Sequence, residues 1–376
     1  MKKGTLDPQI LQQNLVTRIS KDILCQRISG AAVAVLQRGE LIYRAAFGYQ
    51  HPQQSEPLRS DAIFRIASMT KPITTVAVLQ LAQQGKLDLQ DKVSKYLPQY
   101  ERLPMAGGGY NTVPMRIWHL LTHTSAMEAD AGYRETARYQ IPPENNQTLA
   151  GAIDYYAALP LPFEPGAYRR YSGRVAFDVL GRIVELVSGL EFSQYLKQHI
   201  FEPCGMVDTT FAPSDEQWER MVGMHNYQEG VGIAEPTIPG CVVDDCPVTH
   251  PLGGAGLVST LDDYIKFAQM LLNKGMAPGG RVLEEQWVEQ MAGPQLPVEL
   301  MSEHVNQGLG VRVITGDGYP WLPDGTFGWS GAYGTHYWVD PVNEIVAVYL
   351  KNSRYDGGSG ALTGKHFEED VFSAIV

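Results

Sequence analysis

The chain has 376 residues, of which 44% are hydrophobic and 19% charged, and its formal net charge is −11. This ordinary globular composition excludes a disordered or collagen-like chain. No stretch reaches the roughly 18 apolar residues of a membrane-spanning helix, and no basic run offers the positive surface that holds a nucleic-acid backbone. We therefore expect a protein that binds neither nucleic acid nor a membrane.

The first part of the chain predicts a helix, a hairpin and a second helix. Asp7 and Pro8 are typical of a helix start, and apolar residues then recur at helical spacing as far as Ile23. The apolar run 31–36 and the run 41–47 predict a hairpin whose first strand is buried on both faces. A second helix is expected from Ser68 to about residue 84, since Gly85 is a typical helix end.

The rest of the chain divides into a helical middle and a strand-rich end. Residues 85–250 have few strand-like runs, and the clearest helix there is 174–188. Beyond residue 300 we expect strands at 308–314, 335–339 and 345–350, and a final helix over about 365–375.

This order predicts an α+β fold in which an antiparallel sheet is flanked by helices. We expect residues 1–75 and 255–376 to form the sheet domain together, and residues 76–254 to be an inserted, mostly helical domain. The four cysteines (Cys25, Cys204, Cys241 and Cys246) are too few for a disulfide framework. We expect free thiols and a cytoplasmic protein.

Three short segments carry residues that could do chemistry. Ser68 and Lys71 form the only S-x-x-K of the chain, and residues three apart on a helix share a face, so the amine can reach the hydroxyl. Tyr171 precedes the 174–188 helix and could relay a proton. The segment 327–334 is rich in glycine, which allows close backbone approach. Taken singly, each segment also has an ordinary structural interpretation: a surface Ser–Lys pair, a half-buried tyrosine and a glycine-rich hairpin.

Their order along the chain resembles the serine β-lactamase and penicillin-binding protein superfamily. Further segments are similar to motifs of that family: 120–125 (LLTHTS, with Ala126 where the family has glycine) and 253–260 (GGAGLVST) followed by Asp263 and Tyr264. The resemblance covers about residues 15–375, and it implies a β-lactamase/transpeptidase-like fold.

The resemblance also implies roles for individual residues. Ser68 would be the acylated nucleophile, Lys71 would take its proton, and Tyr171 would protonate the leaving group. The oxyanion hole would consist of the backbone N–H groups of Ser68 and Ala332. Whether Lys71 or Tyr171 is the base stays open, since the family itself leaves that dispute open.

Two departures from the family pattern bear on the substrate. Gly173 stands where the family usually has the asparagine of a Y-x-N motif that begins at Tyr171. Trp329-Ser330-Gly331 replaces K-T-G, whose lysine normally recognises a substrate carboxylate. Trp329 offers an apolar stacking surface instead of a charge. With Ser330 and Gly331 as further substrate-binding residues, this pattern is similar to the family VIII carboxylesterases and favours a small, uncharged ester.

Other assignments are weaker or remain open. His119 and His123 are four apart as in H-E-x-x-H, but Leu120 replaces the glutamate, so we expect no metal, and no cofactor either. No G-x-S-x-G of an α/β-hydrolase occurs. The alternatives to a carboxylesterase are a β-lactamase or D-amino-acid peptidase, an acyltransferase that uses the same acyl-enzyme, and a non-catalytic scaffold or sensor. The oligomeric state is not predicted.

Overall fold

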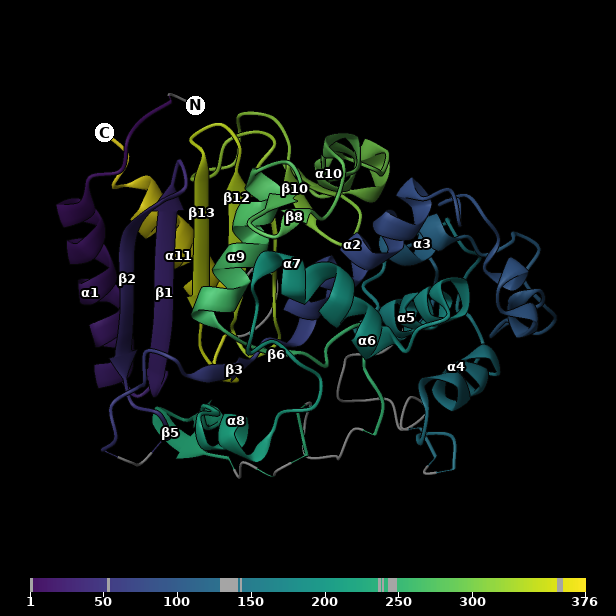
Figure 1. Ribbon diagram of the computed structural model, residues 1–376, viewed down its shortest axis with the longest axis horizontal. Coiled ribbons are helices and arrows are strands. Elements are labelled where there is room, and N and C mark those ends of the chain that lie inside the picture. The colour runs from purple at the N-terminus through teal and green to yellow at the C-terminus, as the bar shows by residue number, and fades with distance from the viewer. Residues whose placement is uncertain are drawn as a thin grey trace.

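A seven-stranded antiparallel sheet forms one side of the computed structural model (Figure 1). The structure describes residues 3–52, 55–128, 141–142, 144–235, 238, 240–242, 249–356 and 361–376. The strand order is β2-β1-β13-β12-β11-β10-β9. The strands are β1 (Gly30–Gln37), β2 (Glu40–Gly48), β9 (Val305–Gln307), β10 (Arg312–Ile314), β11 (Phe327–Ser330), β12 (His336–Asp340) and β13 (Ile345–Leu350). The α+β, β-lactamase/transpeptidase-like fold is thus confirmed.

The first and last helices cover one face of the sheet. Alternate residues of β1, among them Val33 and Val35, pack there with α1 (Pro8–Leu24) and α11 (Leu362–Phe372) in one apolar cluster. The expected start of α1 is confirmed, because the Asp7 carboxylate accepts the N–H groups of Gln9 and Ile10. Both chain ends lie at the same corner of the molecule (Figure 1), where an isolated bridge pairs residues 6 and 375.

The opposite face of the sheet packs on α9 (Leu261–Leu272) and continues into the helical part of the molecule. The intervening residues of β1, Ala32 and Ala34, belong to a second apolar cluster that also contains α2 (Thr70–Gln83) and α5 (Val175–Ser188). Helix α2 is buried from Thr70 to Ala82 and contacts α5 directly. Since this cluster includes both ranges of the chain, the domain limits 1–75 with 255–376 and 76–254 stay a prediction.

The remaining elements are short and lie around this frame. The helices are α3 (Ile117–Leu121), α4 (Leu149–Ala157), α6 (Phe192–Leu196), α7 (Glu202–Cys204), α8 (Asp215–Glu219) and α10 (Glu285–Ala292). The strands are paired as β3 (Ile63–Arg65) with β6 (Val258–Thr260), β4 (His225–Gln228) with β5 (Val231–Ala234), and β7 (Met276–Ala277) with β8 (Gly280–Arg281). The sequence patterns did not predict α9, α10 or the β4–β5 hairpin.

The expected strand 308–314 is wrong in its first half. Residues 308–311 form the turn between β9 and β10, closed by the Gly308 N–H on the Val311 carbonyl at 2.9 Å. Gly310 has φ +65°, and a Cβ there would lie 2.0 Å from the Thr75 Oγ1. The turn therefore needs glycine, which the apolar pattern of the segment concealed. The other expected elements are confirmed within a few residues at their ends.

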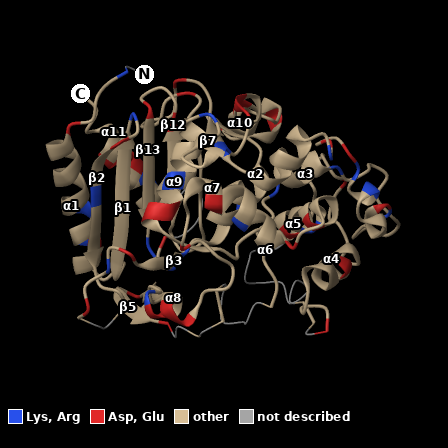
Figure 2. Cartoon of the chain, in the orientation of Figure 1, with Lys and Arg blue, Asp and Glu red and all other residues tan. Residues whose placement is uncertain are grey.

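Charged side chains and helix lengths can be followed over the described part of the chain. Acidic and basic positions are interspersed along the elements in the view of Figure 2. None of the helices in the described ranges combines the length and the apolar character needed to cross a bilayer. Cys25 and Cys204 are free thiols, whereas Cys246 lies outside the described residues.

A buried ionic network joins α11 to the sheet. The Arg312 guanidinium donates to Glu368 Oε1 at 2.5 Å, the Tyr319 hydroxyl donates to Oε2 at 2.8 Å, and His336 Nε2 lies 3.1 Å from Oε1. Burial opposes ionisation of Glu368, but Arg312 and His336 outweigh it and lower the pKa of Glu368 to about 2. The ionised carboxylate is therefore part of the folded state.

We expect Glu368→Gln to lower the free energy of unfolding at pH 7 by about 3 kcal/mol, which is the value of a pKa lowered from 4.5 to about 2. A lowered pKa stabilises the fold above the unfolded value and loses that effect as the pH falls. Urea titrations should therefore show the wild-type advantage shrinking from about pH 5 toward pH 2. An advantage that is constant over this range would contradict the assignment.

Candidate active site

Ser68 lies in a short 3-10 turn (Ala67–Met69) between β3 and α2. The preceding Ala67 has φ +44°, an uncommon conformation for a residue with a side chain. Two contacts fix the turn: the Thr70 hydroxyl donates to the Ala67 carbonyl at 2.7 Å, and the Tyr264 hydroxyl donates to the Met69 carbonyl at 2.8 Å. Ser68 is thus held at the start of a buried helix, with 7% of its surface exposed.

The structure brings Lys71 to Ser68 as the S-x-x-K spacing predicts. The Lys71 Nζ lies 3.2 Å from the Ser68 Oγ, and it donates to the carbonyls of Gly173 at 2.5 Å and Gly254 at 2.7 Å. The lysine side chain is fully buried. Two carbonyls can only accept, so a neutral amine would use both N–H bonds on them and aim its lone pair at Ser68, while an ammonium would donate to all three oxygens.

Tyr171 completes the trio from the other side of the serine. Its hydroxyl lies 2.6 Å from the Ser68 Oγ, and the Lys71 Nζ lies 5.0 Å from the centre of its ring. Tyr171 is 41% exposed, so it lies between the buried serine and solvent. A hydroxyl, an amine and a phenol therefore meet within hydrogen-bond reach of one oxygen.

Close backbone packing holds the two carbonyls that bind Lys71. Residues 253 and 254 run directly over the first turn of α5. A Cβ on Gly253 would lie 2.3 Å from the Phe177 carbonyl oxygen, and one on Gly254 would lie 2.7 Å from the Arg174 carbonyl oxygen. The Gly253 carbonyl also accepts the Thr74 hydroxyl at 2.7 Å. Only glycines allow this segment to reach the lysine.

The end of β11 reaches the serine turn from the sheet. The Thr335 hydroxyl donates to the Ile66 carbonyl at 3.1 Å, and a Cβ on Gly331 would lie 2.5 Å from that same carbonyl oxygen. Ala332 follows as the exposed residue of the turn beyond the strand. The oxyanion hole formed by the N–H groups of Ser68 and Ala332 stays a prediction, and this packing is what brings their segments together.

Trp329 lies behind Tyr171 and is 3% exposed. Its ring stacks on His123, with centroids 5.6 Å apart and planes 14° apart, and lies 6.0 Å from the Tyr171 ring. The stacking partner in the structure is thus His123, and a direct contact of Trp329 with substrate stays a prediction. Burial, Arg169 and Lys71 together lower the pKa of His123 well below its usual value, so the ring packs as neutral imidazole.

The Ser330 side chain makes a hydrogen bond to His336 on the neighbouring strand β12. Its Oγ lies 2.7 Å from His336 Nδ1, and that imidazole contacts Glu368 through its other nitrogen. The carboxylate fixes the ring proton on Nε2, so Nδ1 accepts the Ser330 proton. The Ser330 oxygen keeps its lone pairs for other contacts, and its predicted role toward substrate is untested.

The histidine pair considered as a metal site has structural contacts. His119 Nδ1 accepts the Arg116 N–H at 3.1 Å, and His123 Nδ1 accepts the Ser172 N–H at 3.2 Å. Burial and Arg116 lower the pKa of His119 to about 4. Within the described ranges, no three His, Cys, Asp or Glu side chains are arranged to hold a metal ion.

Two buried carboxyl groups near Lys71 were not predicted. Glu128 Oε2 accepts the N–H groups of Arg174 and Val175 and the Ser172 hydroxyl. Asp178 Oδ1 accepts the Gly254 N–H at 3.1 Å. Burial raises the pKa of Asp178 to about 7, against the opposing effect of Arg174. The sequence could not predict this proximity, because a single acidic residue forms no motif and only the fold brings these two near the lysine.

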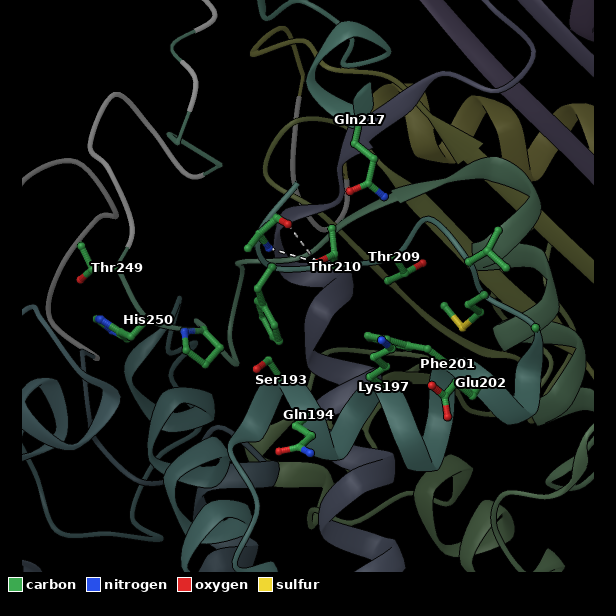
Figure 3. A pocket seen from close by; sticks show the side chains of 16 residues that line it. Ser193, Gln194, Lys197, Phe201, Glu202, Thr209, Thr210, Gln217, Thr249 and His250 are labelled. Carbon is green, nitrogen blue, oxygen red and sulfur yellow. Dashed lines mark hydrogen bonds between the residues drawn. The ribbon is translucent and has the colours of Figure 1, made fainter. Parts of the chain in front are cut away.

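A cavity of about 860 Å³ lies elsewhere, between α6 and the segment 206–212 (Figure 3). Ser193, Lys197, Thr209 and His250 line it, but none of the predicted site residues does. We therefore place the chemistry at the Ser68 trio, where reactive groups converge, and not at this cavity.

Comparisons with known proteins identify the family of the chain. The sequence model of the Beta-lactamase family matches residues 13–366. Esterase EstB of Burkholderia gladioli is 30% identical over 96% of this chain and 95% of its own, and Protein Rv1367c of Mycobacterium tuberculosis is 32% identical over 86% and 85%. The solved structure of EstCE1, described as a hydrolase with promiscuous acyltransferase activity, superposes with a TM-score of 0.83 at 26% identity, covering 97% and 99% of the two chains. The chain belongs to the beta-lactamase family of serine hydrolases.

Proposed function

We propose that the protein is a carboxylesterase that cleaves small, uncharged esters through an acyl-Ser68 intermediate. The observation that carries this proposal is the convergence of Lys71 and Tyr171 on the Ser68 oxygen, at 3.2 and 2.6 Å. Two similar proteins support the reaction class, since EstB is named an esterase and EstCE1 is described as a hydrolase.

The first half of the reaction forms the acyl-enzyme. The Ser68 oxygen attacks the ester carbonyl while its proton passes to Tyr171 or Lys71. The negative charge that develops on the carbonyl oxygen would be held by the N–H groups of Ser68 and Ala332. The tetrahedral intermediate then expels the alcohol, which takes a proton from the Tyr171 hydroxyl, and the acyl group stays on Ser68.

The second half releases the acyl group to water. Water enters from the exposed side of Tyr171 and gives its proton to the same phenol–amine pair while it attacks the acyl carbonyl. The Ser68–acyl bond breaks, the serine regains a proton, and a carboxylic acid leaves. No further group is needed to balance these steps.

The residues at 329–331, where the family usually has K-T-G, support an uncharged substrate. Trp329 stands where the family usually has a lysine that recognises a carboxylate, and the Ser330 proton is directed to His336. Neither residue carries the positive charge with which that lysine binds an anionic group. The protein is further proposed to be cytoplasmic, which the free thiol of Cys204 supports.

The Ser68→Ala variant should lose p-nitrophenyl butyrate hydrolysis by at least about 1,000-fold, because it removes the oxygen that both Lys71 and Tyr171 contact. Ser188→Ala, at the far end of α5, is the matched control and should keep wild-type turnover. Turnover undiminished in Ser68→Ala would overturn the assignment. A chromogenic cephalosporin cleaved well above the ester by wild type would assign the protein to the β-lactamases instead.

Tyr171→Phe separates proton transfer from packing, because it keeps the ring against Lys71 and Trp329 and removes only the hydroxyl. We expect kcat for the same ester to fall by about 100- to 10,000-fold, the usual contribution of general acid–base catalysis. Circular dichroism melting should show little change in Tm. A variant with near wild-type kcat would mean that Lys71 alone handles the proton.

Acyl transfer to an alcohol is the second candidate function, and the description of EstCE1 favours it. Both functions share the acyl-enzyme and differ only in the acceptor. Adding a primary alcohol to the ester assay and separating ester from acid products distinguishes them. Product ester that competes with acid at millimolar alcohol would support transfer, whereas acid alone supports hydrolysis.

A further inference from the structure

One of the two carbonyls that hold Lys71 belongs to a peptide group with a second strong contact. The Gly173 carbonyl, which accepts from Lys71 at 2.5 Å, is in the same peptide as the Arg174 N–H. That N–H donates to Glu128 Oε2 at 2.7 Å. One chain of hydrogen bonds therefore connects the Glu128 carboxylate, the 173–174 peptide and the lysine amine.

Glu128 is held firmly in this place. It is 5% exposed, and its Oε2 accepts three donors, two of them backbone N–H groups at the start of α5. Three donors on one oxygen suit an ionised carboxylate. Its own backbone is left-handed, with φ +58°, where a glycine would be less strained. The side chain is thus kept at a position where the backbone disfavours it.

In this arrangement the charge of the carboxylate can affect the lysine amine through the peptide group between them. A carboxylate on the N–H side of a peptide polarises it, and the carbonyl becomes a stronger acceptor. The other carbonyl on Lys71 lacks this connection, since Asp178 binds the Gly254 N–H, which lies in the peptide before that carbonyl. Negative charge at Glu128 therefore favours the donor form of the Lys71 amine.

We propose that Glu128 is a positioning residue for Lys71: acting through the 173–174 peptide, its carboxylate stabilises the protonated amine and so sets the pH range of the reaction. This inference rests on the proposed esterase function and adds a residue to it. Among the described residues, the ionisable groups around the pair include Asp178 and Arg174 on the α5 side, Tyr156 on α4, and His123, Arg169 and Tyr171.

The experiment measures the pH profile of kcat/KM for p-nitrophenyl butyrate. Glu128→Gln keeps an acceptor oxygen for α5 and removes the charge. Loss of a nearby anion disfavours a cation, so the acid limb of the profile should move to lower pH by about one unit. Glu128→Asp withdraws the carboxylate by one methylene, and a smaller shift in the same direction is expected; this variant also serves if the glutamine variant does not fold.

The matched control is Asp340→Asn. Asp340 is also buried and accepts two backbone N–H groups and a side chain, but it lies at the end of β12. It should lose stability and keep the wild-type pH profile. The shift in Glu128→Gln should also persist in an Asp178→Asn background; a shift that vanishes there came from Asp178 and would overturn the proposal.

The outcomes separate this proposal from the esterase function. Wild-type protein without ester turnover overturns the proposed function. Active, folded Glu128 variants whose profiles coincide with that of wild type, or move to higher pH, overturn only the role of Glu128.

Discussion

The placement of one buried amine organises this site. Lys71 has no exposed surface, and its Nζ is held by two backbone carbonyls and the Ser68 oxygen. A buried amine without partners would be strongly destabilising, so the segments that carry these carbonyls must be in place when the protein folds. One carbonyl comes from the start of α5 and the other from residue 254, so the lysine joins segments that lie about 80 residues apart in the sequence.

Close packing of glycines makes that arrangement possible. Gly253, Gly254 and Gly331 lie where any Cβ would contact a backbone oxygen or carbon within 3 Å. Each brings a backbone segment against an element of the site: α5 in the first two cases and the residue before the serine turn in the third. The glycine-rich segments of the sequence therefore determine the geometry of the site.

The sequence predicted the parts of the molecule that follow local rules. The cap of α1, the fully buried β1 and the Ser68–Lys71 spacing depend on neighbours close in the chain, and all three are as expected. The position of Tyr171 was predicted from the resemblance alone, since no local pattern distinguishes it from the other tyrosines. Ala126 shows the same limit: it has φ +66° at the place where the family has glycine, which explains that glycine afterwards. Glu128, Asp178 and the stacking of His123 on Trp329 arise only from tertiary packing, so no spacing could have predicted them.

Covalent trapping tests the central claim most directly, that the Ser68 oxygen is the attacking nucleophile and that Lys71 and Tyr171 activate it. Incubation with a p-nitrophenyl alkylphosphonate, followed by peptide mass spectrometry, should place one phosphonyl group on the peptide that contains Ser68. Labelling should be slowed strongly in Tyr171→Phe. Stoichiometric labelling of any other residue, with Ser68 unmodified and ester turnover abolished, would contradict the account.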